Sequence, residues 1–192
     1  PTAHAAIPSR PLSSAAMAIA NPCPSSPIRR AEGTRAPSNR TEGLEDIREK
    51  VDAVSARLGR RLKFLMGKPG LDGHSNGAEQ IATRAADIGL AVVYDGIRMT
   101  PDELVERAAQ DRVHILGLSI LSGSHVPLVR EVMQKLRARN ISVPVVVGGI
   151  IPEEDALVLK QLGVAAVYTP KDYDLNKIMD GLVDLIGRGA TG

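Results

Sequence analysis

The chain has 192 residues, a formal net charge of +2 and a single cysteine, Cys23, which excludes an intrachain disulfide and a thiolate metal cluster. Its length suits one domain with some additional sequence, and the lone cysteine together with the lack of a membrane-spanning apolar stretch predicts a cytoplasmic protein. Acids and bases are interspersed, and three Tyr, one Phe and no Trp leave few rings to stack on bases, so we expect no nucleic-acid partner.

Residues 1–43 are rich in Pro, Ser, Ala and Arg and show no apolar period, so they are predicted to be a disordered leader or linker. An organellar targeting segment is the alternative, because the first acid is Glu32 and such segments are rich in Arg and Ser. The prolines argue against the amphipathic helix that a targeting segment requires. The chain begins at Pro1 rather than Met, which suggests processing, a fragment, or an inner piece of a longer protein.

A helical stripe follows this leader. Leu44, Ile47, Val51, Val54 and Leu58 are spaced for one face of a helix over 44–58. We expect the segment 44–59 to pack on the outside of the domain as a lead-in helix.

From residue 60 to 188, short apolar runs alternate with helical patterns. Thr100 is a suitable helix cap with Pro101 behind it, and Gly89 and Gly163 are placed to end helices. Apolar strands that alternate with helices indicate a parallel sheet covered on both faces. The prediction is a flavodoxin-like (Rossmann-like), doubly wound, five-stranded parallel α/β sheet. The expected strands are 62–66, 91–94, 113–118, 143–147 and 165–168, and the expected helices are 77–89, 101–110, 124–139, 153–162 and 173–187.

Three short motifs fall where strands of this sheet should end. Ligands of open parallel sheets bind beyond the carboxyl ends of the strands, so one large ligand can touch all three motifs. They are Asp72-Gly73-His74 with Gly77 after the first strand, Ser119-Ile120-Leu121 after the third, and Gly148-Gly149 after the fourth.

His74 is the candidate metal ligand. A neutral imidazole binds transition metals well when a second group fixes its tautomer, and Asp72 could accept the other ring N–H while Lys68 pairs with Asp72. His125 lies near the same edge, whereas His114 begins a strand at the opposite edge and is expected to be structural. Each motif alone has a commoner explanation as a turn, a helix start or a tight strand-to-helix connection. The three together, in this order, favour a functional site.

The motifs match the signature Asp-x-His-x-x-Gly, Ser-x-Leu, Gly-Gly of cobalamin-binding domains that hold cobalt through a histidine. From about residue 50 to 187 the chain resembles the cobalamin-binding domain of the acyl-CoA mutases, and its sequence is most similar to those of the ethylmalonyl-CoA and methylmalonyl-CoA mutases. The segments that carry the resemblance are GKPGLDGHSNGAEQIA, YDGIRMTP, LGLSILSGSH and VVVGGIIPEEDALVLKQLGVAAVYTPKD.

This resemblance implies that the chain binds adenosylcobalamin in a form in which the cofactor's own benzimidazole has left the cobalt and His74 has replaced it as ligand. Asp72 and Lys68 would then form a hydrogen-bonded relay behind His74. The family's reaction is homolysis of the cobalt–carbon bond, after which a deoxyadenosyl radical starts the carbon-skeleton rearrangement of an acyl-CoA. The barrel that binds the acyl-CoA needs about 250 residues, so this chain should need a barrel-containing subunit or domain as partner and be inactive alone. The slot for the nucleotide tail would be lined by Gly77, Ser119, Leu121, Gly148, Gly149, Tyr168 and Thr169.

Two other classes of protein share the motif. A corrinoid carrier for methyl transfer is one, although such carriers usually have a helical bundle before the domain, and only the helix 44–58 is predicted here. A cobalamin sensor or storage module without catalytic function is the other. A phosphorelay receiver is disfavoured because Ser119 stands where the acceptor Asp is required, and the spacing of the glycines after the first strand does not fit a dinucleotide fingerprint.

Overall fold

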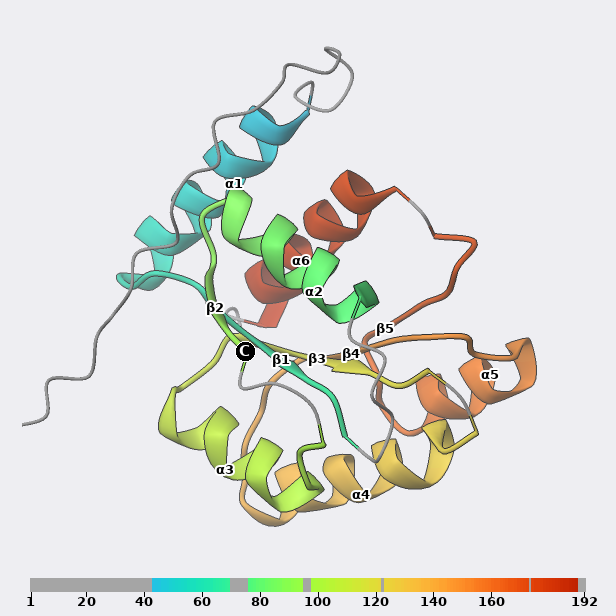
Figure 1. The fold of residues 1–192 in the computed structure, drawn as a ribbon. Coiled ribbons are helices and arrows are strands. Elements are labelled where there is room, and N and C mark those ends of the chain that lie inside the picture. The colour runs from blue at the N-terminus through green and yellow to red at the C-terminus, as the bar shows by residue number, and fades with distance from the viewer. Residues whose placement is uncertain (1–42, 70–75, 95–97, 122, 173, 190–192) are drawn as a thin grey trace, which may run out of the picture. The chain divides into compact units, whose positions relative to one another are not determined.

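The computed structural model describes residues 43–69, 76–94, 98–121, 123–172 and 174–189 (Figure 1). The predicted alternation of helices and strands is confirmed in these residues, and the ends of the elements differ from the prediction by at most two residues. The helices are α1 (Leu44–Leu58), α2 (Asn76–Asp87), α3 (Pro101–Gln110), α4 (His125–Ala138), α5 (Glu153–Gln161) and α6 (Leu175–Gly189), and the strands are β1 (Lys63–Gly67), β2 (Ala91–Val93), β3 (Ile115–Ser119), β4 (Val145–Gly148) and β5 (Ala166–Tyr168).

The strands form one parallel sheet in the order β2-β1-β3-β4-β5. This is the flavodoxin-like order, so the predicted fold class is confirmed. The register pairs Ser119 with Gly148, and Gly148 with Tyr168. The last residues of β3, β4 and β5 therefore lie side by side at one edge of the sheet, where the sequence places two of its three motifs.

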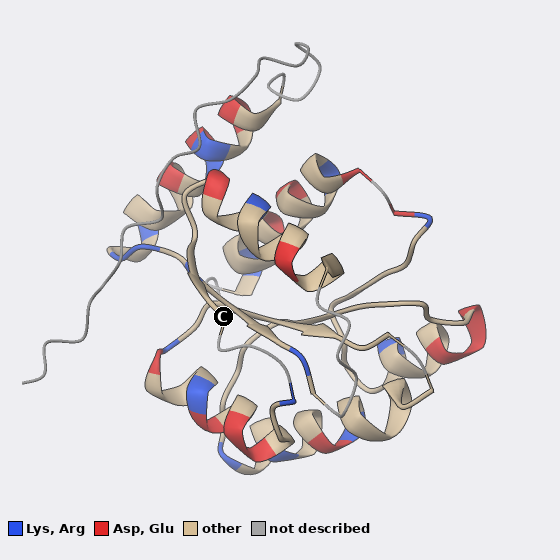
Figure 2. Ribbon diagram, in the orientation of Figure 1, with Lys and Arg blue, Asp and Glu red and all other residues tan. Residues whose placement is uncertain are grey.

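Helices cover both faces of the sheet, with α1, α2 and α6 on one face and α3, α4 and α5 on the other (Figure 1). Successive residues of a strand point to opposite faces. Phe64 and Met66 of β1 therefore pack on the first group of helices, whereas Leu65 packs on the second. Most charged residues of the described part lie on the helices, and both signs occur along them (Figure 2).

The helix ends follow from local sequence. The Thr100 hydroxyl accepts the Glu103 N–H at 3.2 Å, and the Glu103 carboxylate accepts the Thr100 N–H at 2.7 Å. This reciprocal capping box, with Pro101 behind it, starts α3. Gly89 and Gly163 both have φ of +99°, a left-handed conformation suited to glycine after a helix.

The lead-in helix α1 packs on α6, and Lys50 contacts Asp180 and Asp184 of α6 at 2.5 and 2.6 Å. Apart from Gly43, the predicted leader lies outside the described residues, as do Asp72 and His74. None of the described helices is both long and apolar enough to cross a membrane.

Candidate functional site

A cavity of about 570 Å³ lies between the sheet and the helices α2 and α6. Its lining runs from the carboxyl ends of β3, β4 and β5 to residues in the middle of the sheet and on α6. The switch point of the sheet, between β1 and β3, borders the cavity, so its place is the one where open parallel sheets bind ligands.

All of the residues predicted to line a nucleotide slot border this cavity: Gly77, Ser119, Leu121, Gly148, Gly149, Tyr168 and Thr169. The structure thus brings together residues from α2, from the ends of β3, β4 and β5 and from the loops that follow these strands. Lys68 does not line the cavity, and its side chain is completely buried directly after β1. The contribution of each of these residues to binding stays a prediction.

The two adjacent glycines of the third motif have different physical reasons to be glycine. A Cβ atom at Gly148 would meet no atom within 4 Å, because the position faces the open cavity. A Cβ atom at Gly149 would collide with the backbone carbonyl of Ile120. Gly148 therefore keeps the cavity open, whereas Gly149 lets two loops pack backbone against backbone.

The floor of the cavity is apolar. A Cβ atom at Gly117 would lie 2.7 Å from the Phe64 ring, so the glycine allows that ring to lie against β3. Val146 of β4 continues the floor, and Ile178 and Leu182 of α6 face it. An apolar slot of this kind accommodates a flat, apolar heterocycle without leaving buried polar groups unpaired.

Sequence reasoning missed these floor residues. Phe64 and Gly117 lie on the α6-facing side of their strands, and Ile178 and Leu182 fall on one stripe of α6. Alternation along a strand and spacing along a helix could have marked them as inward-facing. Nothing in the sequence indicates that a cavity, rather than packed core, separates them.

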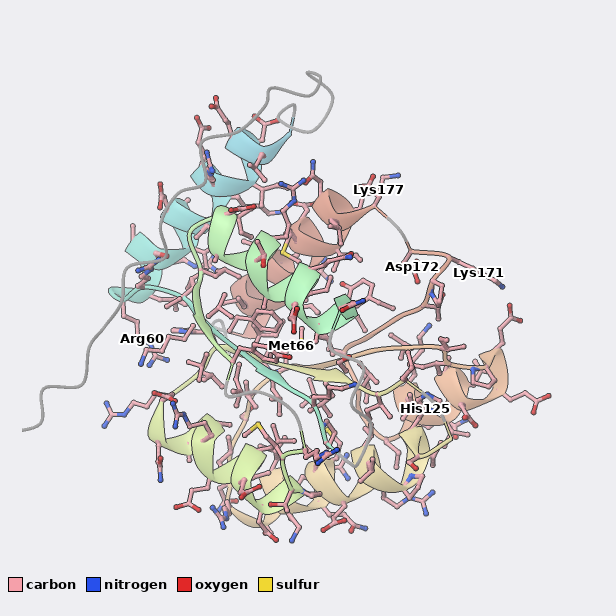
Figure 3. All side chains as sticks on the ribbon, in the orientation of Figure 1. Arg60, Met66, His125, Lys171, Asp172 and Lys177 are labelled. Carbon is pink, nitrogen blue, oxygen red and sulfur yellow. The ribbon has the colours of Figure 1, made fainter. Side chains whose placement is uncertain are left out.

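Polar groups lie at the outer end of the cavity. Asp172 accepts hydrogen bonds from the Thr169 N–H at 2.8 Å and the Thr169 hydroxyl at 3.1 Å, which closes the turn after β5 (Figure 3). Burial, and secondarily the nearby Asp172 carboxylate, raises the pKa of the Tyr168 phenol. Tyr168 is therefore a neutral hydroxyl near neutral pH and can donate a hydrogen bond to a ligand.

His114 has the structural role that the sequence predicts. Its Nδ1 accepts the Lys63 N–H at 2.9 Å, just before β3 at the opposite edge of the sheet. Burial, with the nearby Arg60 and Lys63 charges, lowers the pKa of His114. The neutral imidazole thus accepts a hydrogen bond that links the start of β1 to the residue before β3. It does not line the cavity.

The family profile described as B12 binding domain matches residues 62–175, more than half of the chain. The chain belongs to the B12-binding domain family. The matched segment spans β1 to the start of α6 and includes the cavity-lining motifs together with Asp72 and His74. The predicted family is thereby confirmed, and cobalamin is the ligand that this membership assigns to the domain.

Two relatives show where such domains occur. The chain is 67% identical over 156 residues to ethylmalonyl-CoA mutase from Cereibacter sphaeroides, a match that covers 81% of this chain and 24% of that protein. It is 36% identical over 131 residues to the 2-hydroxyisobutanoyl-CoA mutase small subunit from Aquincola tertiaricarbonis, covering 67% of this chain and 96% of that subunit. The chain therefore spans about a quarter of one mutase and nearly all of the small subunit of another.

The solved structures agree on the fold. A cobalamin-binding protein from Desulfitobacterium hafniense superposes with a TM-score of 0.56 at 21% identity, covering 72% of this chain and 70% of that one. At this identity the similarity establishes the doubly wound fold alone. The ligand assignment rests on the family match and on the cavity.

Proposed function

We propose that this chain is the adenosylcobalamin-carrying part of a radical acyl-CoA mutase of the ethylmalonyl-CoA type. The observation that carries the proposal is the 67% identity to ethylmalonyl-CoA mutase over 156 residues. That stretch makes up 81% of the chain, so the relationship extends well beyond the binding motifs. The domain proper comprises residues 60–188, preceded by the lead-in helix 44–59 and a leader or linker over 1–43.

His74 is the proposed cobalt ligand, with Asp72 behind it. The macrocycle of the cofactor would itself supply cobalt ligands, so one protein ligand would be sufficient, and a carboxylate that accepts the second imidazole N–H would hold the ring in the ligating tautomer. Lys68 supports this arrangement because its ammonium is fully buried four residues before Asp72. A buried ammonium requires an opposite charge nearby, and Asp72 is the proposed one.

The cavity is the proposed slot for the nucleotide tail once the benzimidazole has left the cobalt. Its apolar floor suits the benzimidazole ring, and Gly148 leaves the space that the ring requires. The Ser119 and Tyr168 hydroxyls at the outer end can donate hydrogen bonds to the polar part of the tail. The residues of the chain thus bind and orient the cofactor and exclude water from the buried base.

The bound cofactor supplies a cobalt–carbon bond that breaks homolytically to start radical chemistry. Rearrangement of an acyl-CoA additionally needs a site for the thioester, which we place in a barrel-containing partner domain or subunit. The described residues form a single sheet with its helices and leave no such barrel among them. Specificity for the acyl-CoA should therefore be determined by the partner.

Titration of the chain with adenosylcobalamin, followed by absorbance, tests the proposal. Displacement of the benzimidazole shifts the spectrum, so the wild-type chain should give a saturable base-off spectrum. His74→Ala should retain the fold but bind at least about tenfold more weakly, because even the loss of a group that only supports a metal ligand costs about 10–100-fold. His4→Ala is the control. Equal binding by His74→Ala and the wild type would refute the ligand assignment.

Cobinamide, which lacks the nucleotide tail, tests the slot separately. It should bind far more weakly than cobalamin if the tail occupies the cavity. Equal affinity for the two corrinoids would place the tail outside the cavity.

A further inference from the structure

A glycine in the middle of α6 has no reason within its own helix to be glycine. Gly181 lies well inside α6, between Leu175 and Gly189, and its backbone has an ordinary helical conformation. Glycine is a poor residue for a helix interior, because its backbone loses more conformational entropy there than that of alanine. A contact outside the helix should therefore explain why no side chain is present at this position.

That contact is made by the phenol of Tyr168. Leaving aside α6 itself, a Cβ atom at Gly181 would meet a single atom of the described residues within 4 Å, the Tyr168 hydroxyl oxygen at 3.0 Å. Ordinary contacts between carbon and oxygen are about 3.3–3.6 Å long, so the phenol lies closer to the helix than an alanine would allow. Gly181 thus makes room for this hydroxyl.

The Tyr168 side chain lines the cavity at this point. Ile178 and Leu182, on either side of Gly181 along α6, line the same cavity. On the neighbouring strand β4, Gly148 is the register partner of Tyr168, and its missing side chain leaves the adjacent space open. Since α6 lies on one side of the phenol and open space on the other, a ring displaced from α6 would move into the cavity.

A second glycine of α6 provides a contrast. A Cβ atom at Gly187 would lie 3.3 Å from Nη2 of Arg57, a residue of α1. The Arg57 side chain is long and exposed, so it can move aside. Neither Gly187 nor Arg57 lines the cavity. The same substitution can therefore be made twice in one helix, once behind the cavity and once away from it.

We propose that Gly181 is a positioning residue, which lets the Tyr168 phenol lie against α6 and so keeps the ring out of the slot for the nucleotide tail. The inference rests on the proposed function, because it concerns the residues behind the same slot. In the free chain a displaced ring has room in the cavity, whereas a bound tail needs that room. Binding should therefore depend on Gly181 more strongly than folding does.

The test is titration with cobalamin of Gly181→Ala, alone and combined with Tyr168→Phe. Gly181→Ala alone should bind about tenfold more weakly than the wild type, since overpacking has effects of this order. Combined with Tyr168→Phe, the same change should alter affinity little, because the oxygen atom that it meets is gone. Gly187→Ala is the matched control and should bind like the wild type.

Cobinamide, which lacks the tail, should bind equally well to Gly181→Ala and the wild type. Undiminished cobalamin binding by Gly181→Ala would overturn the proposal. A loss of the same size with and without Tyr168→Phe would also overturn it, because Gly181 would then act independently of the phenol.

Thermal melting without cofactor separates positioning from a packing defect. Alanine stabilises a helix interior, so Gly181→Ala should melt no lower than the wild type. A melting temperature that falls equally with and without Tyr168→Phe would assign Gly181 to the packing of α6 and contradict the positioning role.

The ionisation of Tyr168 gives a readout that needs no cofactor. Burial raises the pKa of this phenol, so displacement into the open cavity should bring its pKa closer to the usual value. The ultraviolet titration of a variant, minus that of the same variant carrying Tyr168→Phe, isolates the phenol. Its pKa should fall in Gly181→Ala and not in Gly187→Ala, and an unchanged pKa in Gly181→Ala would overturn the proposal. If no variant binds cobalamin, the proposed function fails, and this titration still decides whether Gly181 positions the phenol.

Discussion

The paired glycines after β4 provide a sharp test of the site, because adjacent substitutions should have opposite effects. In Gly148→Leu the new side chain enters open space, since a Cβ atom there meets nothing within 4 Å. Stability should remain within about 1 kcal/mol of the wild type, because glycine in a strand has little intrinsic advantage. Cobalamin binding should be lost, because the leucine occupies part of a cavity of about 570 Å³.

Gly149→Ala should behave in the reverse way. Its Cβ atom collides with the Ile120 carbonyl, which cannot move without disturbing the hydrogen bond from the Ile120 N–H to the Gly148 carbonyl. Overpacking costs about 1–3 kcal/mol and the loss of a backbone hydrogen bond about 1 kcal/mol, so we expect a loss of roughly 2–4 kcal/mol. For a domain of this size that corresponds to a decrease in melting temperature of roughly 5–15 °C.

Urea denaturation and thermal melting measure the stability of both variants, and titration with cobalamin measures binding. Gly148→Ala is the intermediate control, because its methyl group takes up little of the cavity. A Gly149→Ala variant as stable as the wild type would refute the packing of the two loops. Undiminished binding by Gly148→Leu would show that the cofactor does not use this cavity.

Three further changes test individual contacts. Gly117→Ala should force the Phe64 ring away from β3, costing about 1–3 kcal/mol in urea denaturation, and a cost near zero would contradict the close approach. Thr100→Ala should remove the cap of α3 at a cost of about 1 kcal/mol, which far-ultraviolet circular dichroism during melting can follow. Hydrogen bonds from Thr100 lower the pKa of Glu103, so the stability that depends on this carboxylate is present at neutral pH and is lost as pH falls through the lowered folded-state pKa. The acid-side stability profile of Thr100→Ala should therefore be flatter than that of the wild type. In an ultraviolet pH titration of tyrosine ionisation, Tyr168→Phe should remove the transition of a phenol whose pKa lies above the usual value. If the variant instead loses a transition at the usual tyrosine pKa, the burial of Tyr168 is contradicted.

The fold could be predicted because its signals are local. Apolar strands such as Val145–Gly148 are buried on both faces only in a parallel sheet covered by helices on each side. Thr100 and Pro101 mark the start of α3 without reference to the rest of the chain. Ser119 and Gly148 could be placed at one edge because parallel strands all end on the same side.

The shape of the site could not be predicted in the same way, because it depends on contacts between distant residues. The Phe64 ring occupies the space left by Gly117 on a neighbouring strand, and this diagonal contact depends on the register of β1 against β3, which sets Met66 opposite Gly117. The apolar stripe of α6 predicts that Leu182 is an ordinary core residue, and only the packed structure shows that it lines a cavity. The 3.4 Å contact between Nδ1 of His125 and Oδ2 of Asp155 likewise depends on how α4 crosses α5.

The central claim is that a histidine of this chain binds cobalt while the cofactor's base lies in the cavity. The most direct measurement is electron paramagnetic resonance of the reduced cobalt(II) form, bound to chains with ordinary and with ¹⁵N-labelled histidine. A protein histidine on cobalt predicts that the nitrogen splitting changes from a triplet to a doublet on labelling, and that His74→Ala abolishes this change. A nitrogen splitting that is the same with and without the ¹⁵N label would mean that the cofactor's own base stays on cobalt. That result would contradict cobalt ligation by a histidine of this chain.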